Sequence, residues 1–263
     1  MAKYLLLLIT LFHLSCSTMK NSRQPQFTAN PTVAHRGAFK KNNLPENSIA
    51  ALEQAIKIGC TGSEFDVRMT SDDSLVINHD PHYNKLEIEK STYDQLAQYP
   101  LSNGEVIPTL REYLKAGLKN NRSTRLICEI KPASSSQLGE KIAEKVLAQV
   151  EELGAKPFIV YISFDYGILK KILQLDPNAN TQYLNGDKSP LSLKQDGIRG
   201  ADYHFSVFQK HPEWIAEALQ NNIDLNAWTV NEEKDMNWLL KEGFQFITTN
   251  EPELLLSKTS SKK

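Results

Sequence analysis

The sequence has few cysteines, no excess of charge of either sign and no apolar run long enough to cross a membrane. Its 263 residues carry a formal net charge of -1 and include three cysteines. A balance so close to neutrality, without a long basic run, argues against a nucleic-acid partner. The N-terminal apolar run, Leu5 to Leu14, is shorter than the roughly 20 residues of a transmembrane helix. What remains is an ordinary globular chain whose length suits one large domain.

That N-terminal run has the form of a secretory signal. Lys3 precedes the apolar residues, and Ser15, Cys16 and Ser17 end them. A cysteine directly after a small residue at this place resembles a bacterial lipoprotein processing site. We therefore expect export to the bacterial periplasm or cell envelope, with lipid on Cys16 as a membrane anchor. His13 departs from the apolar residue usual at its position, so a secreted form without lipid stays open.

The chain divides into four segments on this interpretation. Residues 1–15 form the signal peptide, and residues 16–30, rich in Ser, Asn, Gln and Thr, form a polar tether. Residues 31–256 form the folded domain, and residues 257–263 form a disordered tail.

Two cysteines remain if Cys16 carries lipid. Cys60 and Cys128 both stand in apolar stretches, AIKIGC and LICEI, which is typical of buried, unreactive thiols. An exported location permits a disulfide between them, but their spacing does not require one.

Between the two polar ends, short apolar runs alternate with amphipathic stretches. The eight predicted strands are Thr32–His35, Gly62–Val67, Arg125–Ile130, Phe158–Ser163, Asn180–Leu184, Ala201–Phe205, Asp224–Val230 and Phe244–Thr248. A predicted helix follows each of them, the long ones with an apolar stripe at helical spacing. Eight strand–helix units predict a single-domain α/β protein with the parallel (β/α)8 TIM barrel fold. The chain from Cys16 onward has 263 − 15 = 248 residues, which agrees with the ~250 typical of that fold.

One apolar run does not fit the repeat. Leu75–Asn78 follows the second strand after four polar residues, Ser71 to Ser74, which is too short for a parallel crossover. We expect an antiparallel return strand that brings His79 towards the barrel mouth. Residues 81–108 then form a loop with one short helix near Thr92–Gln98.

Four polar motifs occur in order along the chain, each at a predicted strand end. They are His35-Arg36-Gly37, Glu64-Phe65-Asp66, His79-Asp80 and Glu129-Ile130-Lys131. Each motif alone is more often a turn, a capping pair or a surface ion pair. All four at the carboxyl ends of strands in one barrel predict an active site, because that face of the fold carries the chemistry.

Three carboxylates in this set predict a metal site. Glu64 and Asp66 are two apart on a strand, so their side chains point the same way, and Glu129 lies on the next barrel strand. At ~4 Å and an effective dielectric of ~20, each like-charged pair costs about 4 kcal/mol. A divalent cation removes that repulsion, and ligation by oxygen alone favours Mg2+ or Ca2+.

The remaining polar side chains suit a phosphodiester. Arg36 can hold phosphate oxygens in a forked geometry, and Lys131 adds a point charge. An imidazole ordinarily titrates near neutral pH, so one of His35 and His79 can accept a proton while the other donates to the leaving alkoxide. The location of His79 at the rim favours it as the acid.

At this point the chain resembles the glycerophosphodiester phosphodiesterase family, among the phospholipase C-like phosphodiesterase barrels. The matching stretches are VAHRG (33–37), LPENSIAALEQAIKIG (44–59), EFDVRMTSDDSLVINHD (64–80), IPTLREYL (107–114), ICEIK (127–131), ISFD (162–165), AWTVN (227–231) and ITTNEP (247–252). The resemblance implies the metal, acid–base and phosphate roles already argued. It also implies that Trp228 lines the alcohol pocket. The turn at residues 71–74 lacks the glycine usual there, and the run after Asp80 departs from the family pattern, which leaves the alcohol specificity open.

The resemblance implies a metal-dependent enzyme that hydrolyses small glycerophosphodiesters to glycerol 3-phosphate and an alcohol, and the N-terminal segment predicts that this enzyme is exported. Direct attack by water and prior attack by a substrate hydroxyl are both compatible with these residues. One alternative is a phospholipase that acts on intact lipids, either sphingomyelinase D-like or phosphoinositide-specific. The other is a catalytically silent lipoprotein that binds phosphate esters. Nothing in the sequence indicates the oligomeric state.

Overall fold

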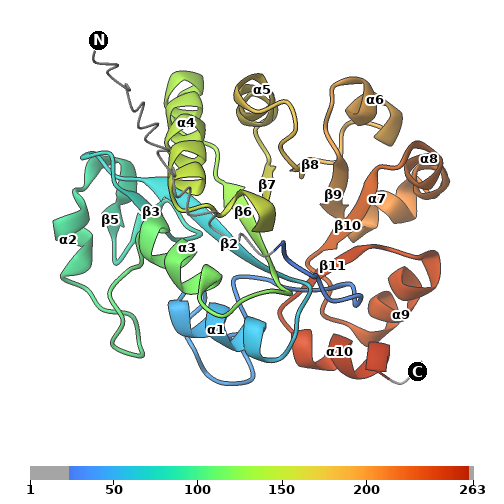
Figure 1. The fold of residues 1–263 in the computed structure, drawn as a ribbon, viewed down its shortest axis with the longest axis horizontal. Coiled ribbons are helices and arrows are strands. Elements are labelled where there is room, and N and C mark those ends of the chain that lie inside the picture. Colours follow the sequence, from blue (N-terminus) through green and yellow to red (C-terminus); the bar gives the residue numbers. More distant parts are fainter. Residues whose placement is uncertain (1–23, 261–263) are drawn as a thin grey trace, which may run out of the picture.

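Eight parallel strands close into a barrel in the computed structural model, which describes residues 24–260. The strands are β1 (Thr32–Ala34), β2 (Gly62–Met69), β6 (Arg125–Ile130), β7 (Ile159–Ser163), β8 (Thr181–Tyr183), β9 (Gly200–His204), β10 (Asp224–Trp228) and β11 (Phe246–Thr249). The chain runs round the barrel in sequence order, and β1 pairs in parallel with both β11 and β2 (Figure 1). The predicted (β/α)8 fold is confirmed.

Helices surround the barrel in the order that the apolar stripes predicted. They are α1 (Ile49–Lys57), α3 (Leu110–Leu118), α4 (Ser136–Glu152), α5 (Tyr166–Leu175), α6 (Pro190–Gln195), α8 (Glu213–Asn221), α9 (Glu233–Glu242) and α10 (Pro252–Ser260). One further short helix, α7 (Phe205–Lys210), was not predicted, and the sixth predicted strand ended at its first residue, Phe205. The strand stops at His204, and the ring nitrogen Nδ1 of His204 accepts from Ser206 N at 3.3 Å, which caps α7.

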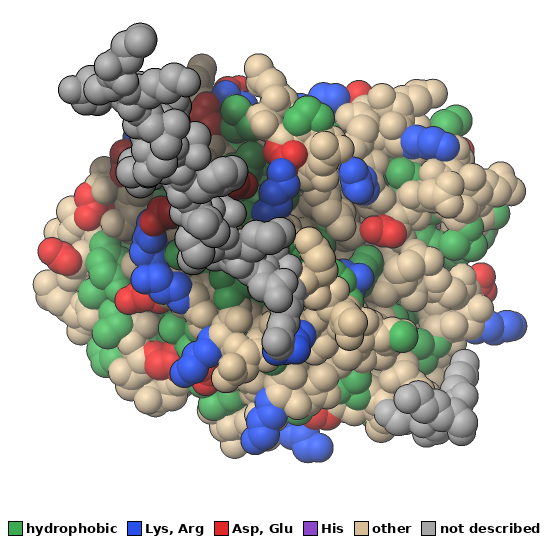
Figure 2. Space-filling model, in the orientation of Figure 1, with side chains coloured by type: hydrophobic (Ala, Val, Ile, Leu, Met, Phe, Trp, Pro, Cys, Tyr) green, Lys and Arg blue, Asp and Glu red, His purple; other side chains and the backbone are tan. Residues whose placement is uncertain are grey.

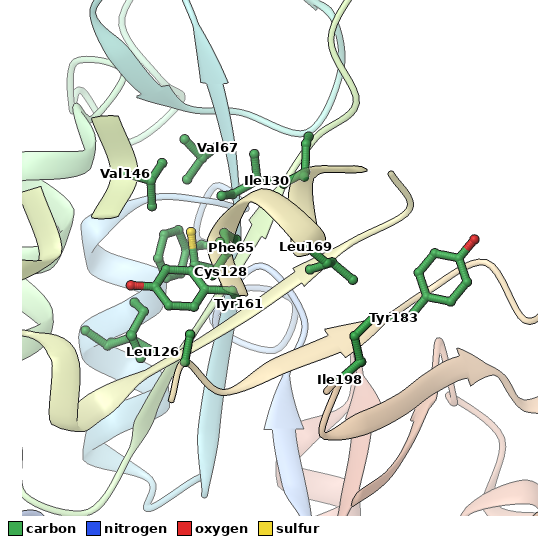
Figure 3. Packing of buried hydrophobic residues seen from close by; sticks show 14 of the residues in the cluster. Phe65, Val67, Leu126, Cys128, Ile130, Val146, Tyr161, Leu169, Tyr183 and Ile198 are labelled. Carbon is green, nitrogen blue, oxygen red and sulfur yellow. The ribbon is translucent and has the colours of Figure 1, made fainter. Parts of the chain in front are cut away.

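Alternation along the strands separates two cores. Side chains such as Phe65, Cys128 and Tyr161 point outward and pack against the helices, where they meet Val146 of α4 and Leu169 of α5 (Figure 3). A smaller apolar cluster fills the barrel interior: Val33, Ile127, Val160, Ile162, Leu184 and Phe246. The outer core holds the shell together, and the inner cluster forms the floor beneath the site. Cys60 and Cys128 are buried free thiols, as predicted.

The return strand is present as β3 (Leu75–Ile77), antiparallel to β2. Asp73 takes the left-handed backbone conformation of the turn (φ 65°), where the family usually has glycine. Beyond β3, the expected loop contains a small hairpin, β4 (His82–Tyr83) with β5 (Leu86–Glu87), as well as the predicted short helix, here α2 (Tyr93–Ala97). This excursion projects from one edge of the barrel (Figure 1) around its own buried cluster of Val76, Ile88, Leu96 and Ile107.

The excursion is fastened to the first helix. Ser48 caps α1, its hydroxyl accepting from Ala51 N at 3.0 Å. The carboxylate of Glu105 accepts from Ile49 N at 2.9 Å and from Ala50 N at 3.1 Å. A negative charge on free N–H groups at a helix N-terminus is stabilising, so this contact fixes the loop end relative to the barrel.

Both predicted polar ends turn out shorter than expected within the described residues. Gln26 N donates to Arg122 O and Thr28 N to Ser123 O, so the last part of the expected tether is bound to the domain. The reason is Phe27, an aromatic residue in a polar stretch, whose ring lies 3.8 Å from the Arg125 guanidinium.

At the other end, α10 continues through the first residues of the expected tail, to Ser260. An ion pair of 2.7 Å from Lys258 to Glu233 joins α10 to α9. The signal segment, Cys16, the tether up to residue 23 and residues 261–263 lie outside the described residues. Between residues 24 and 260, no helix combines the length and apolar character needed to cross a bilayer. Basic and acidic side chains are interspersed on the face shown in Figure 2.

Candidate active site

The predicted site residues meet at the carboxyl ends of the barrel strands. His35 and Arg36 follow β1, Glu64 and Asp66 lie on β2, and Glu129 and Lys131 lie at the end of β6. His79 follows the return strand, and Trp228 ends β10. They surround a cavity of about 130 Å³, lined by His35, Arg36, Glu64, His79, Glu129, Lys131, Ile162, Phe164, Leu184, Asp202, Trp228, Thr229 and Thr248. Asp66 does not line it and lies fully buried behind its wall.

The cavity has two unlike sides. The charged wall consists of Glu64, Glu129 and Lys131, with Asp66 behind them, all from β2 and β6 and the residue after β6. The apolar wall consists of Ile162, Phe164, Leu184 and Trp228, which lie on or directly after β7, β8 and β10.

Three carboxylates converge in the charged wall. Glu64, Asp66 and Glu129 each place one oxygen within 4.8 Å of the others, and all three residues are buried. Burial, with the charges of Asp66 and Glu129, raises the pKa of Glu64 well above its usual range. Burial and the Asp66 charge likewise raise the pKa of Glu129 to about 7. Glu64 Oε1 is buried and accepts no hydrogen bond.

These observations fit a divalent cation. Like charges in low dielectric are costly, and the raised pKa values express that cost. An oxygen with no hydrogen-bond donor, aligned with two other carboxylates, is an available ligand. The residues that would hold the cation are Glu64, Asp66 and Glu129.

Asp66 differs from its two neighbours because it has partners. Asn47 Nδ2 donates to Asp66 Oδ2 at 2.8 Å, and Asp66 N donates to Asn47 Oδ1 at 3.2 Å. Lys131 Nζ lies 3.2 Å from Asp66 Oδ1 and 2.7 Å from Glu129 Oε1, as ion pairs without good hydrogen-bond angles. Burial alone would raise the pKa of Asp66, but Lys131 and Asn47 outweigh it and lower that pKa. Asp66 is therefore the fixed negative charge of the group.

The turn after β1 delivers both a backbone donor and a guanidinium. Arg36 takes a left-handed conformation (φ 54°), and Gly37 follows with φ 83°. A Cβ at position 37 would lie 2.6 Å from the Ala51 side chain, so only glycine fits against α1. The turn lets Arg36 N donate to Glu64 Oε2 at 2.8 Å. The Arg36 guanidinium bonds Glu46 Oε1 at 2.8 Å and lies beside Asp66.

The two histidines face the cavity from different supports. His35 Nδ1 lies 2.7 Å from the amide oxygen of Asn250, which accepts only, so Nδ1 carries the proton and Nε2 is left with a lone pair. Burial and the nearby Arg36 charge lower the pKa of His35 to about 4. It is therefore neutral at pH 7 and suited to accept a proton.

His79 is supported from outside the barrel. Its Nδ1 lies 2.8 Å from Asp80 Oδ1, which leaves Nε2 for the cavity. Its backbone carbonyl accepts two bonds from the Arg68 guanidinium, at 2.9 and 2.8 Å, which fix the end of the return strand. Its side chain is about one-third exposed, in contrast to that of His35.

Trp228 stands in the apolar wall as the resemblance implied. Its indole Nε1 donates to the backbone carbonyl of Asp202 at 2.9 Å. The ring meets Phe164 edge to face, with centroids 5.4 Å apart, and meets His204 in the same way at 5.3 Å. The bond to a main-chain carbonyl fixes the ring as a rigid wall.

The structure thus brings together every residue predicted for the site within the described chain. Sequence reasoning missed the residues that orient them: Asn47, Asn250, Glu46, Arg68 and Asp202. Asn47 and Asn250 lie in stretches that carried the resemblance, LPENS and ITTNEP, and this was the available signal.

Comparison with known proteins agrees with this geometry. Residues 35–254 match the model of the glycerophosphoryl diester phosphodiesterase family. The chain belongs to this family. It is an enzyme, a phosphoric diester hydrolase of the glycerophosphodiester phosphodiesterase type.

Individual relatives cover nearly the whole chain. A glycerophosphodiester phosphodiesterase of Caldanaerobacter subterraneus is 28% identical over 241 residues, 86% of this chain and 96% of that protein. The crystal structure of such an enzyme from Parabacteroides distasonis is similar with a TM-score of 0.86 and 37% identity, covering 90% of this chain and 99% of the other. A phosphodiesterase from Oleispira antarctica, solved in complex with the product sn-glycerol-3-phosphate, shares the fold at TM-score 0.76 and 23% identity, over 88% and 97% of the chains.

Proposed function

We propose that this phosphodiesterase hydrolyses small glycerophosphodiesters to glycerol 3-phosphate and an alcohol, with a divalent cation, Mg2+ or Ca2+, at Glu64, Asp66 and Glu129. The observation that carries the proposal is the convergence of three buried carboxylates beside two cations and two histidines. The product complex of the Oleispira antarctica phosphodiesterase supports the choice of glycerol 3-phosphate as product.

The charges of the site suit this substrate. Three carboxylates with a divalent cation sum to -1, and Arg36 with Lys131 bring the sum to +1. A phosphodiester carries -1, so the complex is neutral. When bound, the cation supplies Lewis-acid stabilisation of the charge that develops on the phosphate oxygens. Arg36 and Lys131 hold those oxygens and orient the phosphorus for attack.

The histidines divide the proton transfers. His35 Nε2 accepts a proton from the attacking hydroxyl, because its Nδ1 is held protonated by Asn250 and its burial keeps the ring neutral. His79 Nε2 donates to the leaving oxygen at the rim, with Asp80 holding the opposite nitrogen. If water attacks, its proton goes to His35 and the alcohol leaves with the proton of His79, which gives glycerol 3-phosphate directly. If a substrate hydroxyl attacks, the same transfers give a cyclic phosphate, and water must then open it to glycerol 3-phosphate.

Substrate size favours a deacylated diester over an intact lipid. The cavity is about 130 Å³, which suits a headgroup-sized ligand. A lipase needs an apolar rim for acyl chains. The large exposed hydrophobic side chains of the described residues are Tyr99, Val106, Leu175, Leu191 and Leu219, and none of them lines the cavity.

A substrate panel tests the proposal. Purified protein is treated with EDTA and then given Mg2+, Ca2+ or Zn2+ with glycerophosphocholine, glycerophosphoethanolamine, lysophosphatidylcholine and sphingomyelin. We expect release of glycerol 3-phosphate from the first two, lost in EDTA and restored by Mg2+ or Ca2+. Turnover confined to the lipids would replace this proposal by the phospholipase alternative. Absence of turnover with every metal would favour the silent phosphate-ester-binding lipoprotein.

We also propose export and a lipid anchor at Cys16, which the sequence of the N-terminal segment supports. Cys16→Ser should move the protein from the membrane fraction to the soluble fraction, with unchanged turnover per molecule. Cys60→Ser, a buried thiol in the domain, serves as the control that should not relocate. Equal distribution of Cys16→Ser and parent would remove the anchor and leave export to be tested by processing of residues 1–15.

A further inference from the structure

One carboxyl in the cavity takes no part in the chemistry proposed above. Asp202 lies on β9 and lines the cavity beside the apolar wall, yet its residue is only 1% exposed. Its Oδ1 is buried and has no hydrogen-bond partner. Buried polar atoms are nearly always hydrogen-bonded, and a bare one that faces a cavity is open for a ligand.

The polar side chains near Asp202 in the barrel interior hydrogen-bond to one another. Asn226, which pairs with Asp202 across β9 and β10, donates through Nδ2 to Gln182 Oε1 at 3.2 Å. The Thr248 hydroxyl donates to Asn226 Oδ1 at 3.1 Å. Neither of these bonds involves the carboxyl of Asp202, and Asp202 itself lines the cavity.

Asp202 also adjoins the indole ring of Trp228 in the apolar wall. Its backbone carbonyl accepts from Trp228 Nε1 at 2.9 Å, so its side chain and the indole belong to one rigid unit. The ligand that meets Asp202 must therefore present a polar group next to an apolar surface. A glyceryl group does this, since it carries hydroxyls on a three-carbon chain.

We propose that Asp202 is a specificity-determining residue that hydrogen-bonds a hydroxyl of the substrate's glyceryl group. Burial, reinforced by the Glu129 charge, raises the pKa of Asp202 well above its usual range. A carboxyl that keeps its proton has one O–H donor and one carbonyl acceptor, which matches a hydroxyl in both directions. A cationic headgroup would instead require its ionisation in this buried place.

The inference rests on the proposed function, and its test measures binding without turnover. Dissociation constants are measured for glycerol 3-phosphate and for n-propyl phosphate, which differ only in the two hydroxyls, on parent, Asp202→Leu and Asp202→Asn. The metal-supplemented full protein is used throughout. Thermal melting confirms that each variant is folded, and Asp202→Asn keeps the shape of the site should Asp202→Leu not fold.

In the parent we expect glycerol 3-phosphate to bind about tenfold or more tightly than n-propyl phosphate. Asp202→Leu should remove most of this ratio by weakening glycerol 3-phosphate alone, and Asp202→Asn should keep most of it, because an amide also donates and accepts. Asp224→Asn, which alters a carboxyl at the start of β10 that does not line the cavity, is the control and should leave the ratio unchanged.

Two results would overturn the assignment. An equal weakening of both ligands by Asp202→Leu would show a structural role only. Selective weakening of phosphocholine against 3,3-dimethylbutyl phosphate, in both Asp202→Leu and Asp202→Asn, would show a site for a cation. Either result leaves the hydrolysis of glycerophosphodiesters by the parent intact, so the two proposals fail separately.

Discussion

The two sides of the cavity differ in the side chains that form them: one is charged and the other is apolar. The charged wall gathers three carboxylates and Lys131 from two neighbouring strands, and its groups are held by ion pairs and by Asn47. The apolar wall, from β7, β8 and β10, is held by the edge-to-face contact of Phe164 with Trp228 and by the hydrogen bond of the indole. It includes no charged side chain. The contrast suggests a division of tasks: in the proposed function, side chains from β2 and β6 bind the metal and the phosphate, and side chains from β7, β8 and β10 select the substrate. Alterations of one wall should therefore leave the task of the other unchanged.

The largest expected effect is the loss of a carboxylate from the charged wall. Asp66→Ala or Glu129→Gln should abolish metal-stimulated turnover, a loss of at least about 10³-fold, because a ligand and its charge are removed. The melting temperature of metal-free Glu129→Gln should stay equal or rise, since like-charge repulsion is relieved. That of Asp66→Ala should fall, because Asn47 and Lys131 lose a buried partner. Metal titration by calorimetry and thermal melting check this. Full activity of Asp66→Ala in EDTA would disprove the metal assignment.

The histidines come next. His35→Asn and His79→Asn should each lower kcat/KM by roughly 10²–10⁴ and each remove one limb of a bell-shaped pH profile. A p-nitrophenyl phosphodiester has a leaving group that needs no protonation. It should restore much of the rate of His79→Asn and little of that of His35→Asn. Equal rescue of both variants, or of neither, would contradict the division of labour.

Proton competition at the charged wall gives the third effect. The ordinary pKa of Glu129 is 4.5 and its value in the metal-free fold is about 7, so the fold retains a proton in this interval that the unfolded chain loses. Stability from this group is therefore complete below pH 4.5 and is lost as pH rises through 7. Metal binding displaces the proton, so affinity should increase up to about tenfold per pH unit between pH 5 and 7.

Calorimetry in two buffers of different ionisation enthalpy counts the protons released on metal binding. The count should fall as pH rises and should be smaller in Glu129→Gln. An affinity that does not change between pH 5 and 8 would contradict the raised pKa values of this wall.

The smallest effect belongs to the apolar wall. Trp228→Ala should lower kcat/KM by about 3- to 10-fold through loss of aromatic contact, and change the preference among substrate alcohols. Metal affinity should stay as in the parent. Trp228→Phe keeps a ring without the indole donor and separates the contact from the bond to Asp202. A change of metal affinity in Trp228→Ala would show that the two walls are coupled.

The fold and the residues of the candidate site could be predicted from the sequence, because both are marked by short-range sequence patterns. Most barrel strands are short apolar runs, and Glu64, Asp66 and Glu129 lie on β2 and β6, with Lys131 directly after β6, where the fold brings them to one end of the barrel. The helix α7 and the hairpin of β4 and β5 carry weak local signals and depend on contacts made after folding.

The residues that orient the site are far in sequence from the side chains they contact. Asn250 reaches His35 across 215 residues and Asn47 reaches Asp66 across 19, so no spacing rule relates them. Asp202 was missed for a different reason. A single acidic residue in an apolar strand is most simply interpreted as a surface residue. That Asp202 Oδ1 is buried without a hydrogen-bond partner is visible only in the structure.

Phe27 packs at the amino-terminal ends of the barrel strands, and this location has a consequence for the orientation of the protein in the cell envelope. Phe27 and Thr28 contact Arg125 and Thr61, at the end of the barrel opposite the active site. If Cys16 carries lipid as proposed, only seven residues, 17–23, separate it from Gln24, and the eight steps between them span at most roughly 28 Å of extended chain. The bilayer would then lie nearest the closed end, and the mouth would open towards the aqueous phase. Such an enzyme collects diesters that diffuse past it, and a flexible insertion after Ser22 should leave their turnover unchanged.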